Sequence, residues 1–78
     1  MKLPRGISAD SLLRALERLG YKADGQQGSQ IRLLHDGPPA HAVTIPRTNV
    51  LKTGTLRGIL TEAAQARGLT IEAIVEML

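Results

Sequence analysis

The sequence has no cysteine, tryptophan or phenylalanine, and Tyr21 is its only aromatic residue. Without cysteine, disulfides and cysteine-ligated zinc sites are excluded, and two histidines are too few for a convincing metal cluster. One aromatic side chain cannot support widespread base stacking, which argues against RNP-type sheets and OB-folds. No apolar run approaches the roughly 18 residues that span a membrane, and the first residues lack a hydrophobic signal region. We therefore expect a cytoplasmic protein with no membrane segment, metal or other cofactor.

The length of 78 residues predicts one small domain, residues 1–78, with a core of aliphatic side chains. The formal net charge of +3 is unevenly distributed along the chain. Residues 25–61 contain four Lys or Arg and one Asp, whereas residues 62–78 contain one Arg and three Glu. A basic centre followed by an acidic tail fits a phosphate-facing surface in the middle of the chain. Ordinary solubilising charge is the alternative, and the charge alone favours it.

Three helices are predicted from apolar spacing and from residues that start and stop helices. Ser8 is a suitable N-cap for the first, its leucines recur at helical spacing (12, 13, 16 and 19), and Gly20 is a natural stop. The second runs from about Thr53 to Gly68, with an apolar stripe. That stripe consists of Leu56, Ile59, Leu60, Ala63 and Ala64. A short third helix, about residues 70–78, is capped by Thr70.

Three short strands are predicted between the first two helices, at residues 21–24, 30–34 and 42–45. Residues 25–28 are expected to form the first turn, and Asp36–Pro39 is a strong turn signal before the third strand. Connections this short favour antiparallel pairing. The predicted class is α+β, a three-stranded antiparallel sheet with two main helices on one face and a short C-terminal helix.

Strand alternation assigns side chains to the two faces of this sheet. Ile31 and Leu33 are expected to point into the core, as are Val43 and Ile45. Gln30 and Arg32 then share the opposite face with Ala42 and Thr44. By the same alternation His41 points toward the core side and is expected to be a half-buried residue at a strand end, while His35 is expected to be an exposed loop residue.

Five fragments occur together in a fairly specific order and spacing: Met1–Arg5 (MKLPR), Leu19–Tyr21 (LGY), Gly28–Leu33 (GSQIRL), Val43–Pro46 (VTIP) and Leu51–Leu56 (LKTGTL). Each fragment is weak alone. Together they resemble the HicA toxin family of bacterial toxin–antitoxin modules, over residue 1 to about residue 66. The resemblance implies the topology of a double-stranded-RNA-binding domain. It also implies an mRNA endonuclease that inhibits translation and is neutralised by a partner antitoxin, HicB.

The resemblance also implies a catalytic site, because the family's catalytic residue is the histidine of a Gly-Ser-His motif. The matching residues here are Gly28, Ser29 and Gln30, so the histidine is replaced. Metal-free RNA cleavage needs groups that take and give protons, and glutamine does not titrate near neutral pH, whereas histidine does. Losing general acid–base catalysis costs about 10²- to 10⁴-fold in rate. We expect a weak or inactive nuclease, whether Gln30 is an introduced substitution or a natural change in a decayed or repurposed copy.

The remaining candidate residues are proposed to contact RNA. Gly28 and Ser29 form either a plain turn into a strand or a close backbone approach to phosphate, with the Ser29 hydroxyl as a donor. Lys52 and Thr53 open the second helix, whose free N–H groups suit a phosphate, although simple capping by threonine is the alternative. By similarity to double-stranded-RNA-binding domains, Lys52 and Arg57 are expected to contact phosphates. Arg32 joins them because it shares a sheet face with Gln30.

Two rival functions remain open on the sequence. One is a non-catalytic RNA- or protein-binding module that never cleaves. The other is a structural domain whose only partner is a HicB-like protein covering the face with Gln30 and Arg32.

Overall fold

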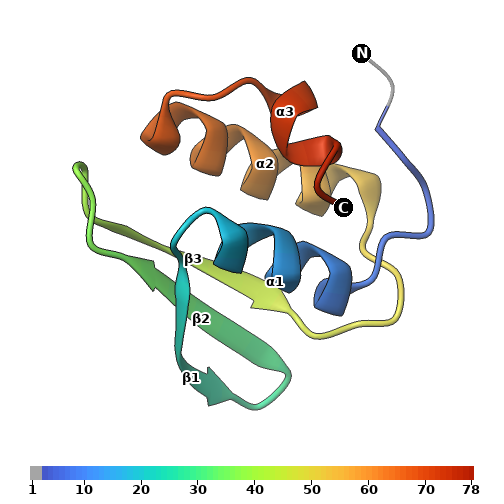
Figure 1. Cartoon of the computed structure of the whole chain (residues 1–78). Helices are drawn as coiled ribbons and strands as arrows, with labels where there is room; N and C mark the ends of the chain where they lie inside the picture. Colours follow the sequence, from blue (N-terminus) through green and yellow to red (C-terminus); the bar gives the residue numbers. More distant parts are fainter. Residues whose placement is uncertain (1–2) are drawn as a thin grey trace.

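The computed structural model describes residues 3–78, so Met1 and Lys2 of the N-terminal fragment lie outside the described residues. The elements follow the order α1 (Ala9–Arg18), β1 (Lys22–Gln27), β2 (Gln30–His35), β3 (His41–Pro46), α2 (Thr53–Arg67) and α3 (Ile71–Val75). The strands form one antiparallel sheet in the order β1-β2-β3, and the helices lie on one side of it (Figure 1). The predicted α+β class is confirmed. No helix of the described part is long and apolar enough to cross a membrane.

Both ends of α1 are set by the residues that the sequence indicated. The Ser8 side chain accepts a hydrogen bond from the Ser11 backbone N–H at 3.1 Å, which satisfies one of the free donors at the helix start. Past the other end, Gly20 takes a φ of +100°, a left-handed conformation that few other residues adopt. Leu12 and Leu16 are completely buried between α1 and the sheet.

The inner face of the sheet carries the core, as strand alternation predicts. The buried strand residues are Ile31, Leu33, Val43 and Ile45, and they pack against the apolar stripes of α1 and α2. On the other face, Gln30, Arg32 and Thr44 are exposed. Because only one face is buried, a slip of one residue would expose the whole core, so the register is strongly specified.

The first strand differs from its prediction. β1 runs from Lys22 to Gln27 rather than over residues 21–24, and the turn is Gly28–Ser29 rather than residues 25–28. A register shift between Ala23 and Gly25 marks a β-bulge, which lets the strand continue past the glycine. Every residue of β1 is exposed, so no apolar alternation marks this strand in the sequence.

The second and third helices complete the core. α2 starts at Thr53 with Lys52 at the N-cap position and has no side-chain capping bond, so threonine capping, the alternative to a phosphate site, is absent there. It ends at Gly68, whose φ of +67° makes a left-handed C-cap. α3 is capped by the Thr70 hydroxyl, as predicted, but its helix ends at Val75 instead of residue 78. Ile74 is fully buried, which shows that the last helix packs on its own chain.

Candidate functional site

The tight connection between β1 and β2 places Gln30 at the surface. Gln27 pairs with Gln30, which leaves Gly28 and Ser29 as the two residues of the turn. Gly28 has a φ of +60°, while Ser29 does not adopt a positive φ, the pattern of a type II′ hairpin turn with glycine first. Gln30 is therefore fixed as the first residue of β2, opposite Pro46 on β3.

Two side chains on the inner side of the sheet brace this turn. The Gln26 amide donates to the Gly28 carbonyl at 3.2 Å and accepts from the Arg47 guanidinium at 3.1 Å. The Arg47 backbone N–H also donates to the Ser29 carbonyl at 2.6 Å. Arg47 thus joins the turn to the loop that leads from β3 to α2, and its side chain remains exposed.

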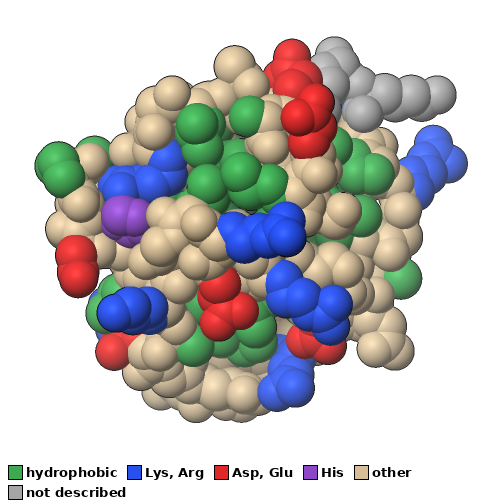
Figure 2. Space-filling view, in the orientation of Figure 1, with side chains coloured by type: hydrophobic (Ala, Val, Ile, Leu, Met, Phe, Trp, Pro, Cys, Tyr) green, Lys and Arg blue, Asp and Glu red, His purple; other side chains and the backbone are tan. Residues whose placement is uncertain are grey.

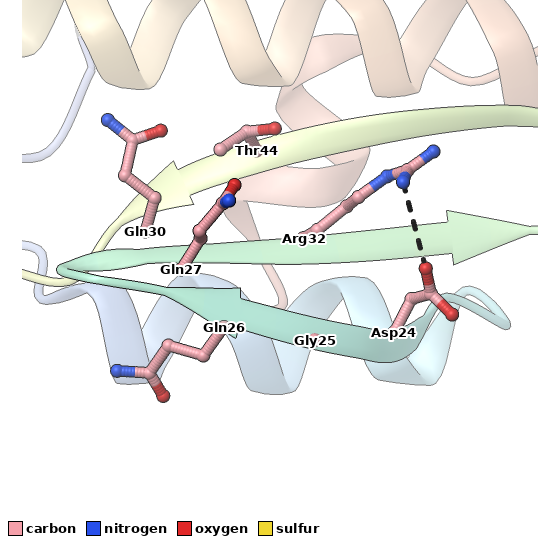
Figure 3. Close-up of a pocket in the computed structure, with 7 residues that line it drawn as sticks. All are labelled: Asp24, Gly25, Gln26, Gln27, Gln30, Arg32 and Thr44. Carbon is pink, nitrogen blue, oxygen red and sulfur yellow. Dashed lines mark ion pairs between the residues drawn. The ribbon is translucent and has the colours of Figure 1, made fainter.

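A shallow hollow of about 520 Å³ lies on the outer face of the sheet, and we refer to it as the sheet hollow. Its lining includes Asp24, Gly25, Gln27, Gln30, Arg32 and Thr44. Figure 3 shows that the side chains of Gln27, Gln30, Arg32 and Thr44 project on one side, whereas Gln26 points away. Arg32 lies 3.8 Å from the Asp24 carboxylate in an exposed ion pair, which contributes little to stability.

The sheet hollow contains hydrogen-bonding groups but no histidine. Within residues 3–78, the side chains of Gln27, Gln30 and Thr44 make no hydrogen bond to the protein, although each can both donate and accept. His35 and His41 pair with each other at the far end of β2 and β3. At about 3.3 Å per residue, the five-residue separation puts them roughly 17 Å from position 30. Neither histidine can serve as an acid or base beside Gln30.

The two histidines instead form a polar cluster with Tyr21 and Arg67. The Tyr21 hydroxyl is hydrogen-bonded to Nε2 of His41, and the Tyr21 ring meets both imidazoles edge-on at centroid distances of 4.9 and 5.3 Å. Burial raises the pKa of the Tyr21 hydroxyl, and the positive charge of Arg67 works against that rise. His41 is half-buried at a strand end, as expected.

His35 was expected to be an exposed loop residue, and that prediction is wrong. It is the last residue of β2 and is half-buried. Its Nδ1 accepts from the Gly37 N–H, and its Nε2 lies 2.9 Å from the Leu19 carbonyl oxygen. The Arg67 guanidinium lies against the ring and donates to the Pro39 carbonyl at 2.6 Å. These contacts give both histidines structural roles.

A family model described as the HicA toxin of bacterial toxin–antitoxin matches residues 9–65, which is most of the chain. This chain belongs to the HicA toxin family. Searches of curated proteins and of solved structures return no match. The family match begins after the N-terminal fragment and ends within α2, so it covers four of the five sequence fragments and excludes α3.

The structure of this HicA chain gathers some of the predicted site residues and separates others. Gln30 and Arg32 line the sheet hollow, and Gly28 and Ser29 form the turn beside it. Lys52 and Thr53 lie at the start of α2, with Arg57 on its exposed surface, and none of the three lines the hollow. Lys52 and Arg47 are the two ends of the loop that joins α2 to β3. This loop connects the two groups of residues.

Sequence reasoning missed two residues of the site in this HicA chain. The predicted turn over residues 25–28 includes Gln27, and the signal that places this residue in the strand is the glycine-first pattern of a two-residue hairpin at Gly28. Arg47 belongs to no sequence motif. Its place beside the turn follows only from the pairing of Gln30 with Pro46, the residue before it. The helix-side face carries basic and acidic side chains interleaved, without one basic patch (Figure 2). Charge on that face therefore does not indicate a phosphate site.

Proposed function

We propose that this HicA-family chain is an RNA-binding toxin scaffold whose endonuclease activity is impaired at position 30. The observation that carries the proposal is the setting of Gln30. It is exposed at the start of β2, beside the Gly28–Ser29 turn, with no histidine within reach. An active metal-independent nuclease of this design would place its proton-transferring histidine there, in contact with the RNA 2′-hydroxyl. Glutamine can still donate and accept hydrogen bonds, but it does not take up or release a proton near neutral pH.

The proposed RNA contacts extend from the sheet to the start of α2. Arg32, Ser29 and Gly28 lie beside residue 30, and Arg47 is held next to the turn by its backbone bond to Ser29. Lys52, Thr53 and Arg57 stand at the start of α2, where uncapped backbone N–H groups favour an anion. In this proposal Arg47, Lys52 and Arg57 bind successive phosphates and fix the strand, and residue 30 faces the bond to be cut.

The proposed cellular setting is a cytoplasmic toxin–antitoxin pair in which a HicB-like protein neutralises the chain and the target is mRNA. The antitoxin is proposed to cover the face with Gln30 and Arg32, because blocking that face would exclude RNA. No metal takes part in the proposed chemistry. A non-catalytic RNA-binding or antitoxin-binding module is the second candidate, supported by the absence of histidine from the sheet hollow.

The decisive experiment restores histidine at position 30. We expect Gln30→His to cleave RNA about 10²- to 10⁴-fold faster than the present chain, the range that general acid–base catalysis supplies, and to arrest growth on expression. Ala42→His is the matched control, because it puts a histidine on the same exposed sheet face but further along β3 from Pro46, the partner of Gln30, and it should cleave no faster than the present chain. If Gln30→His is folded but inert in both assays, the silenced-nuclease proposal fails. The binding module then becomes the better description.

A further inference from the structure

The sheet hollow has the size and chemistry of a site for one nucleotide. About 520 Å³ falls in the range of small-molecule pockets. Two amides and a hydroxyl, from Gln27, Gln30 and Thr44, line it without partners in the described protein. Side chains that offer a donor and an acceptor together match the edges of nucleic-acid bases.

The dimensions of the chain argue against recognition of a long duplex. Double-stranded-RNA-binding domains contact about 16 base pairs across two minor grooves. The β1–β2 connection of this chain is only the Gly28–Ser29 turn. Such a short turn cannot reach a second groove. An unpaired strand, whose bases are free to turn outward, is the RNA that this face can read.

A base in the hollow would be held without an aromatic platform. Tyr21, the only aromatic residue, is 1% exposed and cannot stack on RNA. The planar guanidinium of Arg32 can stack on a base instead, and Asp24 lies close enough to orient it. Gly25 sits opposite Arg32 and leaves open space, because a Cβ atom built there would meet nothing within 4 Å.

We propose that the sheet hollow binds one unpaired RNA base, which Arg32 stacks on and Gln27 and Thr44 read by hydrogen bonds. This inference rests on the proposed RNA-binding function and adds to it the substrate class and two specificity-determining residues. The bound base lies next to residue 30, so its identity sets the preferred position of cleavage in a chain with histidine there.

The test measures equilibrium binding of the present chain to a short single-stranded RNA in which an abasic nucleotide is moved through each position. We expect one position where loss of the base weakens binding about 5- to 100-fold, the scale of one well-read base. The same RNA annealed into a duplex should bind more weakly. Gln27→Ala combined with Thr44→Val should reduce the dependence on which base occupies that position.

Gly25→Val supplies a variant that fills the hollow without straining the fold. It should bind the intact strand as weakly as the parent chain binds the abasic one, and it should no longer respond to the abasic position. Ala23→Val is the control. It also places a valine on β1, but on the opposite face of the sheet, and it should bind RNA like the parent chain. Circular dichroism on both variants checks that the fold is intact.

Four results would overturn the inference, and they differ in what else they refute. Salt-dependent binding with a flat abasic scan refutes the base site but leaves the proposed RNA-binding function standing. Preference for the duplex does the same. If Gly25→Val binds RNA normally and loses only a HicB-like partner, the hollow is a protein site. An absence of RNA binding at any salt concentration refutes this inference together with the proposed function.

Discussion

Replacing Tyr21 with phenylalanine removes one hydroxyl and keeps the ring that packs between the two histidines. The hydroxyl is the partner of His41 Nε2, and Tyr21 itself is 1% exposed. A lost hydrogen bond costs about 0.5–1.5 kcal/mol, and more where the remaining group is sealed from water. His41 is only half-buried, so water can reach part of it. We expect Tyr21→Phe to lower the free energy of unfolding by about 1 kcal/mol.

That loss corresponds to a fall in Tm of about 4–8 °C for a domain of this size. Thermal unfolding should be followed by circular dichroism. Tyr21→Phe removes the only tyrosine of the chain, so the signal of that side chain cannot follow unfolding in both proteins. His41→Ala, alone and combined with Tyr21→Phe, completes a double-mutant cycle. A coupling of about 0.5–3 kcal/mol is expected for residues in contact. An unchanged Tm, or strictly additive effects, would refute the reasoning that this bond stabilises the fold.

The same residue predicts how stability depends on alkaline pH. Burial raises the pKa of Tyr21 in the folded protein, although Arg67 opposes the rise. Above about pH 10 the unfolded chain loses the phenolic proton while the folded chain keeps it, so stability falls as pH increases. The contribution is fully present below pH 10 and is lost as pH rises through the folded pKa. Urea titrations at several alkaline pH values should show a steeper decline for the parent than for Tyr21→Phe.

Two further predictions concern the turn and the glycines. Arg47→Gln keeps the backbone bond to Ser29 and loses only an exposed side-chain hydrogen bond to Gln26, so Tm should change little. The slope of log binding constant against log salt should shrink by about 0.7 for single-stranded RNA. Arg14→Gln on α1 is the control, and an equal slope in both variants would show that Arg47 does not contact the RNA. Gly20→Ala should lower Tm strongly, because φ is +100° and the new Cβ would lie 2.8 Å from His35 Nε2. Gly25→Ala, which meets open space, should be nearly neutral, and equal effects at the two glycines would contradict the argument.

The helices could be predicted because local signals set them. Ser8 and Thr70 cap helices, Gly20 and Gly68 follow helix ends with positive φ, and leucine spacing marks the buried faces. The faces of β2 and β3 followed from alternation, since one face is buried and the other is open. That same alternation is enough to predict that Gln30 and Arg32 share a face.

The parts that could not be predicted depend on contacts between distant segments. β1 has no buried residue, so no pattern of apolar residues in the sequence predicts that the strand continues to Gln27. The structural role of His35 depends on its contacts with Arg67, the last residue of α2, and with Leu19, the residue after α1. Arg47 gains its place from backbone pairing that carries no sequence signature. Local patterns therefore predict elements, whereas the polar contacts that join them need the tertiary structure.

The exposure of Gln30 has a consequence for how such a chain can evolve. Its side chain contributes nothing to the core, and within residues 3–78 it has no hydrogen-bond partner. Selection for a stable fold therefore does not distinguish histidine from glutamine at this position, and a single base change in the codon interconverts them. If residue 30 carries the proposed proton transfer, a lineage could lose and regain nuclease activity through this one codon without a compensating change elsewhere in the chain. The exposed surface around position 30 would hardly alter with that change.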